Sequence, residues 1–158
     1  MGKVLDTYRR YRALLAAGDF AHLTEVVDEN WVENCVGLTG WTIGLDVAVA
    51  NFSAGIAAAF SSLENDEEEL IETNDTLVIR GRGHGTHVGA FLDVPATQRR
   101  VSWDYVEMFR LGADQRIQWH FFVSDWNYVR EQLLGRELDL PTTPTRRAVV
   151  AERAQRRS

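Results

Sequence analysis

The sequence has little cysteine and no long apolar run. Its 158 residues include a single cysteine, Cys35. One cysteine excludes an internal disulfide framework and a zinc site built from several thiolates. The most apolar stretch, Val47 to Phe60, is interrupted by Asn51 and Ser53 and is too short to cross a bilayer. The charged N-terminus has no apolar core of the kind that a signal peptide needs, so we expect a cytoplasmic protein with no membrane partner.

An excess of basic charge is also missing. The formal net charge is -6, although residues 146–158 carry five arginines and one glutamate, which leaves -10 on the rest of the chain. An acidic body argues against nucleic acid as a partner. The length and the apolar content of 45% suit one domain with its own core. We therefore expect one domain over residues 1–138 and a flexible basic tail over residues 139–158.

Hydrophobic periodicity predicts an α+β fold. It indicates helices over 3–17, 20–27, 46–60 and 127–134, and strands over 29–36, 70–73, 76–80, 101–111 and 117–126. In the first helix Leu5, Tyr8, Arg12 and Leu15 share one face, and Gly18 ends the helix. The acidic run 64–69 and the segment 37–44 are expected to be loops. Strands joined by short turns favour antiparallel pairing, and a curved sheet wrapped on helices would leave one apolar-lined mouth.

The glycine-rich segment 81–85 is neither a dinucleotide fingerprint nor a P-loop, because the spacing is wrong and no helix pattern follows. Glycines in a strand permit a bulge or a close backbone approach. His84 and His87 lie three residues apart, so on an extended chain they point to opposite faces and cannot share a metal ion. We expect no metal site. A histidine that faces the sheet interior here could serve the site, or it could be a structural histidine bonded to the backbone.

The strand 101–111 has one bulky aromatic face, which we expect to point inward. This face carries Trp103, Tyr105 and Glu107. A carboxylate among aromatic side chains needs a partner or acquires a raised pKa, because burial of a lone charge is costly. Glu107 is therefore a candidate acid or base. The structural alternative is a glutamate that pairs with an arginine or lies at the rim of the sheet.

The strand 117–126 is almost entirely apolar, so burial on both faces is expected, and its ionisable residues are His120 and Asp125. Asp125 could accept a proton at the mouth of an aromatic pocket, or it could cap the helix that follows. Asn34, beside Trp31 in the early strand, is either a hydrogen-bonding residue of the site or an exposed polar residue. Cys35 is expected to be an inert buried thiol.

Three segments resemble the SnoaL-like polyketide cyclases. Gly85 to Trp103 resembles their GTHxGxFxGxPxTGrxVxW stretch, and Phe109 to Ile117 resembles their FRxxdGKI element. His120 to Asp125 is similar to their HWxxxD segment. The likeness runs from about Tyr11 to Gly135.

The resemblance implies the cone-shaped α+β fold of nuclear transport factor 2 and ketosteroid isomerase, with a curved antiparallel sheet on three N-terminal helices. Cyclases of this family close an aromatic polyketide ester by an intramolecular aldol reaction without a cofactor, and the position of Asp125 holds their base. The resemblance also implies a homodimer or a higher homo-oligomer and a hydrophobic aromatic substrate. In our leading hypothesis the residues that position or polarise the substrate are His87, His120, Tyr105, Glu107 and Asn34, and those that shape the slot are Trp31, Trp103 and Phe121.

The chain departs from the family at several of these positions. The cyclases carry Gln and His where this chain has Tyr105 and Glu107, Trp where it has Phe121, and Gly where it has Asp93. Glu107 could take over as acid or base, or pair with His87 or His120. An aldol cyclase is the leading hypothesis. The alternatives are a tailoring hydroxylase or its partner, an isomerase, dehydratase or epoxide hydrolase on the same fold, and a non-catalytic binding or dimerisation module.

Overall fold

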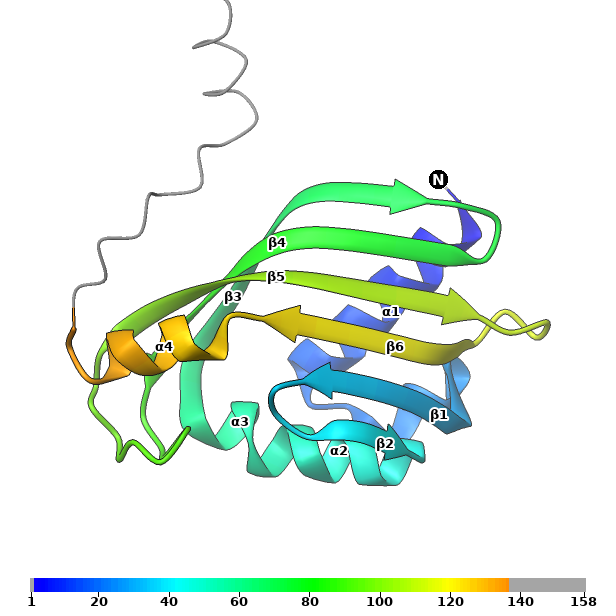
Figure 1. Cartoon of the computed structure of the whole chain (residues 1–158). Helices are drawn as coiled ribbons and strands as arrows, with labels where there is room; N and C mark the ends of the chain where they lie inside the picture. The colour runs from blue at the N-terminus through cyan, green and yellow to red at the C-terminus, as the bar shows by residue number, and fades with distance from the viewer. Residues whose placement is uncertain (1, 137–158) are drawn as a thin grey trace, which may run out of the picture.

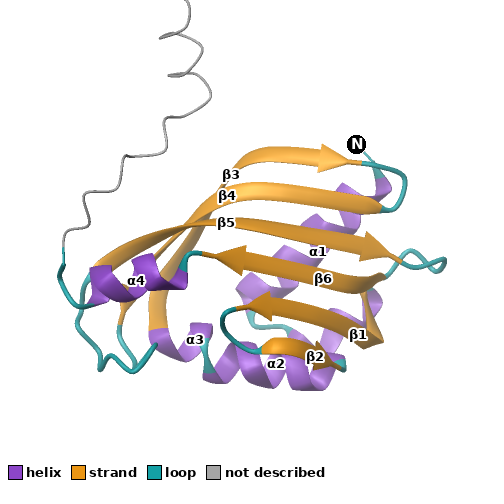
Figure 2. Cartoon of the chain, in the orientation of Figure 1, coloured by secondary structure: helices purple, strands orange, loops and turns teal. Residues whose placement is uncertain are grey.

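The computed structural model describes residues 2–136 and contains one curved sheet with helices packed on its concave side (Figures 1 and 2). The predicted tail, 139–158, lies outside the described residues. The elements in chain order are α1 (Lys3–Ala17), the 3-10 helix η1 (Phe20–Glu25), β1 (Val27–Val36), β2 (Gly40–Ile43), α2 (Leu45–Ala54), α3 (Ile56–Ala59), β3 (Phe60–Glu72), β4 (Thr76–His87), β5 (Arg100–Leu111), β6 (Ile117–Ser124) and α4 (Trp126–Leu133).

The six strands lie in the order β2-β1-β6-β5-β4-β3. The predicted α+β class with a curved sheet is confirmed. The expectation of a wholly antiparallel sheet is wrong at one place, because β1 runs parallel to β6 while the other neighbours are antiparallel. Short turns favour antiparallel pairing only between strands that follow one another in the chain, and β1 and β6 are far apart in sequence.

Helix α1 crosses the concave side of the sheet and packs against β4 and β5 (Figure 1). Its buried residues include Val4 and Tyr8, and the Tyr8 ring lies 5.0 Å from that of Phe109. Gly18 ends the helix in the left-handed conformation, as its position predicted, and its N–H bonds to the last turn. The extent of the first helix is confirmed, whereas its predicted face is confirmed only in part, because Tyr8 is buried but Leu5, Arg12 and Leu15 are half-buried and Leu14 is buried instead.

The glycines of β4 make room for aromatic rings on β5. Gly81 and Gly83 face the concave side, opposite Tyr105 and Trp103. A Cβ atom at Gly81 would lie 2.6 Å from the Tyr105 hydroxyl oxygen, and one at Gly83 would overlap the Trp103 indole. The close approach that the glycine spacing suggested is confirmed. The irregular pairing lies in the partner strand β3, where the register shifts twice.

Several boundaries differ from the predictions. The acidic run 64–69 is part of β3 and is not a loop, because pairing with β4 gives its backbone partners and Arg80 and Arg100 neutralise some of its carboxylates. The segment around Trp41 forms β2 against β1. The helix expected over 46–60 is broken at Gly55, and the one over 20–27 is a 3-10 helix. Among the described residues, no helix has the length and apolarity that crossing a membrane requires.

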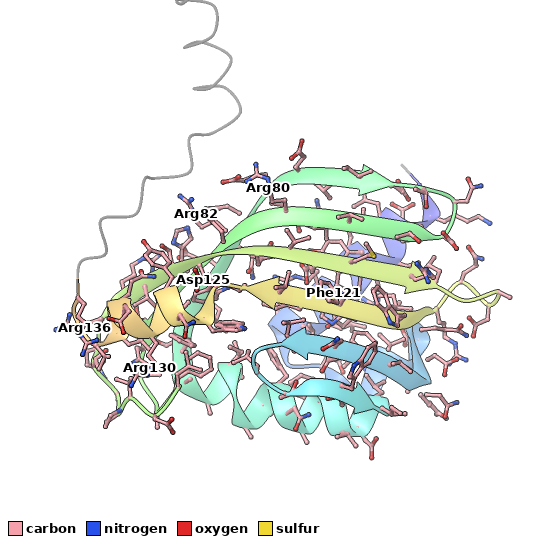
Figure 3. All side chains as sticks on the ribbon, viewed as in Figure 1. Arg80, Arg82, Phe121, Asp125, Arg130 and Arg136 are labelled. Atoms are coloured by element: carbon pink, nitrogen blue, oxygen red, sulfur yellow. The ribbon has the colours of Figure 1, made fainter. Side chains whose placement is uncertain are left out.

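Within the described residues 2–136, α1, α2 and α3 lie on the concave side of the sheet and do not cover its convex face (Figure 2). Phe121 and Trp119 alternate with the inward residues of β6, so their rings lie on this face, stacked with centroids 6.1 Å apart (Figure 3). The expectation that 117–126 is buried on both faces is therefore wrong. Trp41 on β2 adds a further aromatic ring, 67% exposed, to the same row of the sheet as Phe121.

Candidate functional site

A cavity of about 980 Å³ lies between the concave side of the sheet and the helices. Its volume falls at the upper end of the range for small-molecule sites. Most of its walls are apolar, and its aromatic lining comprises Tyr11, Phe20, Trp31, Phe52, Phe60, Phe91, Trp103, Phe122 and Trp126. Such walls suit a flat, largely apolar molecule with an aromatic system.

Three strands bring ionisable groups to one part of this cavity. Glu33 of β1, Glu107 of β5 and His120 of β6 all line it, and all three side chains are nearly buried. The Nδ1 atom of His120 lies 3.2 Å from a carboxylate oxygen of Glu33, and its Nε2 atom lies 3.4 Å from one of Glu107. The imidazole is thus held between two carboxylates, as the sequence suggested for Glu107 and one of the histidines.

The two carboxylates decide the charge of the ring. Burial alone would lower the pKa of His120, but hydrogen bonds from the ring to Glu107 and Glu33 outweigh it and raise that pKa above its ordinary value. Because both ring nitrogens face carboxylate oxygens, the arrangement favours the imidazolium form, which donates an N–H to each carboxylate. The charge is shared within the cluster, so none of the three groups is an isolated buried ion.

Arg12 brings a second cation to the cavity wall from α1. Burial would lower the pKa of its guanidinium, but the nearby charge of Glu107 raises that pKa above the ordinary value. Two cations therefore line the same cavity as the Glu107 carboxylate, one from the sheet and one from the helix. With Glu33 and Glu107 the four groups have no net formal charge, and the two cations are the groups that could stabilise negative charge on a bound molecule.

Cys35 lies beside this cluster and also lines the cavity. Its thiol, with Glu33 and His120, offers three metal-ligand atoms within 4.8 Å of one another. Burial and the neighbouring Glu33 raise the pKa of the thiol to about 12, so it is protonated near neutral pH. In the imidazolium form of His120, a ring proton lies between its Nδ1 atom and Glu33. The protonated cluster is therefore complete in its hydrogen bonds, and a metal ion would have to displace both protons.

Four of the residues singled out from the sequence line the cavity: Trp31, Trp103, Glu107 and His120. Tyr105 does not. It points inward and is buried, with its ring stacked on Phe122 at 5.6 Å, behind the cavity wall.

His87 is buried at the end of β4, where its Nδ1 atom accepts the backbone N–H of Thr97 at 3.2 Å. It is not among the residues that line the cavity. Burial lowers the pKa of its imidazole, so the ring is neutral. The structure thus matches the alternative of a structural histidine, and it places His84 on the opposite face of the strand, as predicted.

Asp125 is solvent-exposed at the junction of β6 and α4 (Figure 3). Its carboxylate accepts the backbone N–H of Tyr128 at 3.0 Å, which makes it the N-cap of α4. The cavity lining includes its neighbour Trp126 but not Asp125. The expectation that this carboxylate stands among the pocket aromatics is therefore corrected, and its role as a base stays a prediction.

Asn34 and Phe121 also lie outside the cavity. The two are register partners on β1 and β6 and share the convex face of the sheet. The strand alternation explains their placement, because the inward positions of these strands are taken by Glu33, Cys35, His120 and Phe122. Neither residue can contact a ligand held in the cavity.

Two charged residues of the cavity, Arg12 and Glu33, were not proposed for the site from the sequence. Arg12 had been placed on the inward face of the first helix, and an arginine on an apolar face was the available signal. Glu33 interrupts an otherwise apolar inward row that begins at Trp31. Both could have been found by asking which charged side chains share a face with the core.

Solved structures with the same fold are numerous, although no curated protein matches the chain in sequence. A SnoaL-like polyketide cyclase from Agrobacterium tumefaciens C58 is 23% identical, with a TM-score of 0.68 over 84% of this chain and 99% of its own. IdmH of Streptomyces antibioticus, a candidate polyketide cyclase, is 23% identical, with a TM-score of 0.71 over 84% and 98%. AclR of Streptomyces galilaeus, a candidate hydroxylase, is 21% identical, with a TM-score of 0.68 over 97% and 90%. At these identities the likeness establishes the fold alone.

The family is established by the sequence itself. The model of the SnoaL-like polyketide cyclase domain matches residues 5–133. This span includes every element that forms the cavity, from α1 to α4. The chain therefore belongs to the SnoaL-like polyketide cyclase family.

Proposed function

We propose that this protein is an enzyme that performs proton-transfer chemistry on an aromatic, polyketide-like substrate, and that the reaction is an intramolecular aldol cyclisation. The observation that carries the proposal is the cavity of about 980 Å³, whose walls are aromatic and whose ionisable groups form one cluster. A binding module would need the aromatic walls but not two carboxylates and two cations in contact with the same space. The family assignment supports the same class of reaction.

Glu107 is the proposed base. It lines the cavity, its side chain is nearly buried, its carboxylate lies 3.4 Å from the His120 ring, and Arg12 lines the same cavity. Asp125, by contrast, is exposed and its side chain is used as a helix cap. A base must come within hydrogen-bonding reach of the carbon-bound proton that it removes, so the carboxylate inside the cavity is the better placed of the two.

In the proposed reaction Glu107 removes a proton from an activated methylene carbon of the substrate. The electrons of the broken C–H bond delocalise onto the adjacent carbonyl oxygen to give an enolate. The charges of His120 and Arg12 stabilise this enolate electrostatically, as preorganised cations do in a site that excludes water. The enolate carbon then forms a bond to a second carbonyl of the same molecule, and the resulting alkoxide takes up one proton. Atoms are conserved, so product and substrate have the same mass.

His120 and Glu33 keep Glu107 in place. Because both ring N–H groups of His120 bond to carboxylates, the imidazolium contributes its charge and fixes the orientation of Glu107. Glu33 in turn holds the ring from the opposite side. The aromatic walls, chiefly Trp31, Trp103 and Phe122, hold the planar part of the substrate.

The test is incubation with candidate aromatic polyketide esters, followed by mass spectrometry of the products. Cyclisation gives an isomer of unchanged mass, and the proposal predicts that Glu107→Gln abolishes its formation. A matched control is Glu131→Gln, because Glu131 lies on α4 and pairs with Arg136 outside the cavity. A product heavier by one oxygen atom would indicate hydroxylation and overturn the cyclase assignment. Conversion that Glu107→Gln leaves unchanged would overturn the role of Glu107.

A further inference from the structure

A chain of polar side chains leads from the cavity cluster to the opposite surface of the protein. Glu107 uses one carboxylate oxygen toward His120, and its other oxygen, Oε1, lies 3.5 Å from the hydroxyl oxygen of Tyr8. Tyr8 in turn donates to Oε1 of Glu67 at 2.8 Å. Glu67 pairs with Arg9, whose side chain is 51% exposed. The chain thus begins at a group that lines the cavity and ends at solvent.

The position of Glu67 sets it apart from the other acidic residues of β3. It pairs in register with Gly81, which faces the concave side, and its side chain is only 14% exposed. The neighbouring Glu68 bonds to Arg80, which points outward on β4. Glu72, at the end of β3, accepts backbone N–H groups at the start of α1, whereas the carboxylate of Glu67 is directed at Tyr8.

The hydroxyl of Tyr8 has one proton and lies near two carboxylates, those of Glu67 and Glu107, so it can donate to only one of them at a time. When its proton is donated to Glu67, the contact with Glu107 lacks a proton unless Glu107 itself carries one. A proton taken up by Glu107 would therefore complete the chain, with Glu107 donating to Tyr8 and Tyr8 donating to Glu67. Burial and the neighbouring Glu107 raise the pKa of the Tyr8 hydroxyl, so Tyr8 passes protons on without becoming a stable phenolate.

We propose that Tyr8 and Glu67 form a proton relay that connects Glu107 with solvent while a substrate fills the cavity. The proposal rests on the function assigned to Glu107 above. In one transfer, Glu107 gives its proton to the Tyr8 oxygen as Tyr8 gives its own to Glu67, and Glu67 releases it to water. Tyr8 is unchanged by the transfer and Glu107 returns to the carboxylate. The 3.5 Å contact must shorten during transfer, as catalytic hydrogen bonds often do when a ligand binds.

The relay changes the fate of an abstracted proton. With the relay, the proton on Glu107 exchanges with solvent before it returns to the substrate carbon. Without it, Glu107 returns the same proton to the carbon from which it came, and an enolate that has turned over in the cavity receives that proton on its opposite face, which racemises the ketone without exchange. A test therefore needs a ketone in which proton removal and isotope exchange can be counted separately. (R)-2-Methyl-1-tetralone is such a probe, because its one α-hydrogen lies on a stereocentre.

The experiment measures racemisation by chiral chromatography and deuterium uptake by mass spectrometry, both in heavy water. The wild type is expected to take up one deuteron for each racemisation. In Tyr8→Phe and in Glu67→Gln, deuterium uptake is expected to fall behind racemisation by about tenfold or more, less than the roughly hundredfold effect of a group that transfers the proton directly. A merely structural role would slow both processes equally. Equal rates of uptake and racemisation in both variants would overturn the relay.

The controls use the same chemical changes elsewhere in the chain. Tyr128→Phe alters a tyrosine of α4, and Glu68→Gln alters the outward neighbour of Glu67. Both should keep the wild-type ratio of uptake to racemisation. Glu67→Gln is the more informative of the two relay variants, because an amide oxygen can still accept from Tyr8 but cannot carry the proton onward.

A second measurement needs no turnover. In protein labelled with ¹⁵N-histidine, whose cavity is filled with 2,2-dimethyl-1-tetralone, a ketone that has no α-hydrogen, exchange of the His120 ring N–H with water can be followed by NMR. The relay predicts slower exchange in Tyr8→Phe and Glu67→Gln than in the two controls. If the two relay variants leave the exchange of the His120 N–H unchanged, the relay is overturned, even if 2-methyl-1-tetralone is not a substrate. If they slow this exchange but the wild type does not racemise 2-methyl-1-tetralone, the relay is supported and the role of Glu107 as base is refuted. The two proposals can therefore fail separately.

Discussion

Replacement of Glu107 by Gln tests the charge assignment of the buried cluster. Gln has nearly the same shape but no charge, so His120 would keep one carboxylate partner, Glu33, in place of two. Both His120 and Glu107 are at most 6% exposed, so solvent does little to screen the loss. Removing one partner from a buried ion pair costs about 3–5 kcal/mol. Because His120 can release its proton and become neutral, we expect the substitution to lower the free energy of unfolding by the smaller of these values, about 3 kcal/mol at pH 6.

The loss of stability caused by Glu107→Gln should decrease as the pH rises. The pKa of His120 is raised in the folded protein, so the stability that its charge contributes is fully present below the unfolded pKa of about 6.5. It is lost as the pH rises through the folded pKa. The difference between wild type and Glu107→Gln should therefore be larger at pH 6 than at pH 9.

Urea denaturation at the two pH values measures this difference, and NMR titration gives the pKa of His120 in each protein. Glu131→Gln, which removes a partly exposed carboxylate that pairs with exposed Arg136, should cost less than about 1 kcal/mol at either pH. A loss for Glu107→Gln that is equal at pH 6 and pH 9 would refute the reasoning. An NMR titration in which Glu107→Gln leaves the pKa of His120 unchanged would also refute the reasoning.

Three further predictions concern other parts of the chain. Gly83→Ala places a methyl group against the Trp103 ring and should lower the free energy of unfolding by about 1–3 kcal/mol; an unchanged thermal unfolding curve would contradict the packing account. Phe121→Asp puts a charge on the convex face, which we propose as the homo-oligomer interface, and should reduce the mass in light scattering to that of a monomer; an unaltered mass would exclude this face. The Cys35 thiol has a pKa raised to about 12, so only a very small fraction of it is thiolate at pH 8. It should therefore react with iodoacetamide about a thousandfold more slowly than an ordinary thiol, of which roughly a quarter is thiolate at this pH. Alkylation at the rate of the urea-unfolded protein would show that the thiol is not protected.

The sequence was sufficient for features that depend on local pattern. The extent of α1, its end at Gly18 and the inward face of β5 all follow from periodicity and capping, and each is observed. The opposite orientations of His84 and His87 follow from strand alternation in the same way. These predictions needed no knowledge of what packs against each element.

Features that depend on pairing could not be read in this way. The run 64–69 resembles a solvated loop because its carboxylates have no local partners, and only its pairing with β4 makes it a strand. Asp125 satisfies both a pocket motif and an N-cap, and the sequence cannot say which way its side chain turns. The contact of His120 with Glu33 joins residues 87 positions apart, across the parallel pair β1 and β6. Nothing in either segment alone indicates it.

The most direct test of the central claim is hydrogen exchange at the activated methylene of an aromatic ketone, 2-tetralone, followed by NMR in heavy water. The account predicts that the wild type accelerates this exchange above the buffer rate and that Asp125→Asn, at the exposed cap of α4, exchanges as fast as the wild type. Glu107→Gln should lower the enzymatic rate by about a hundredfold or more. Full exchange in Glu107→Gln together with loss of exchange in Asp125→Asn would contradict the account and return the role of base to Asp125.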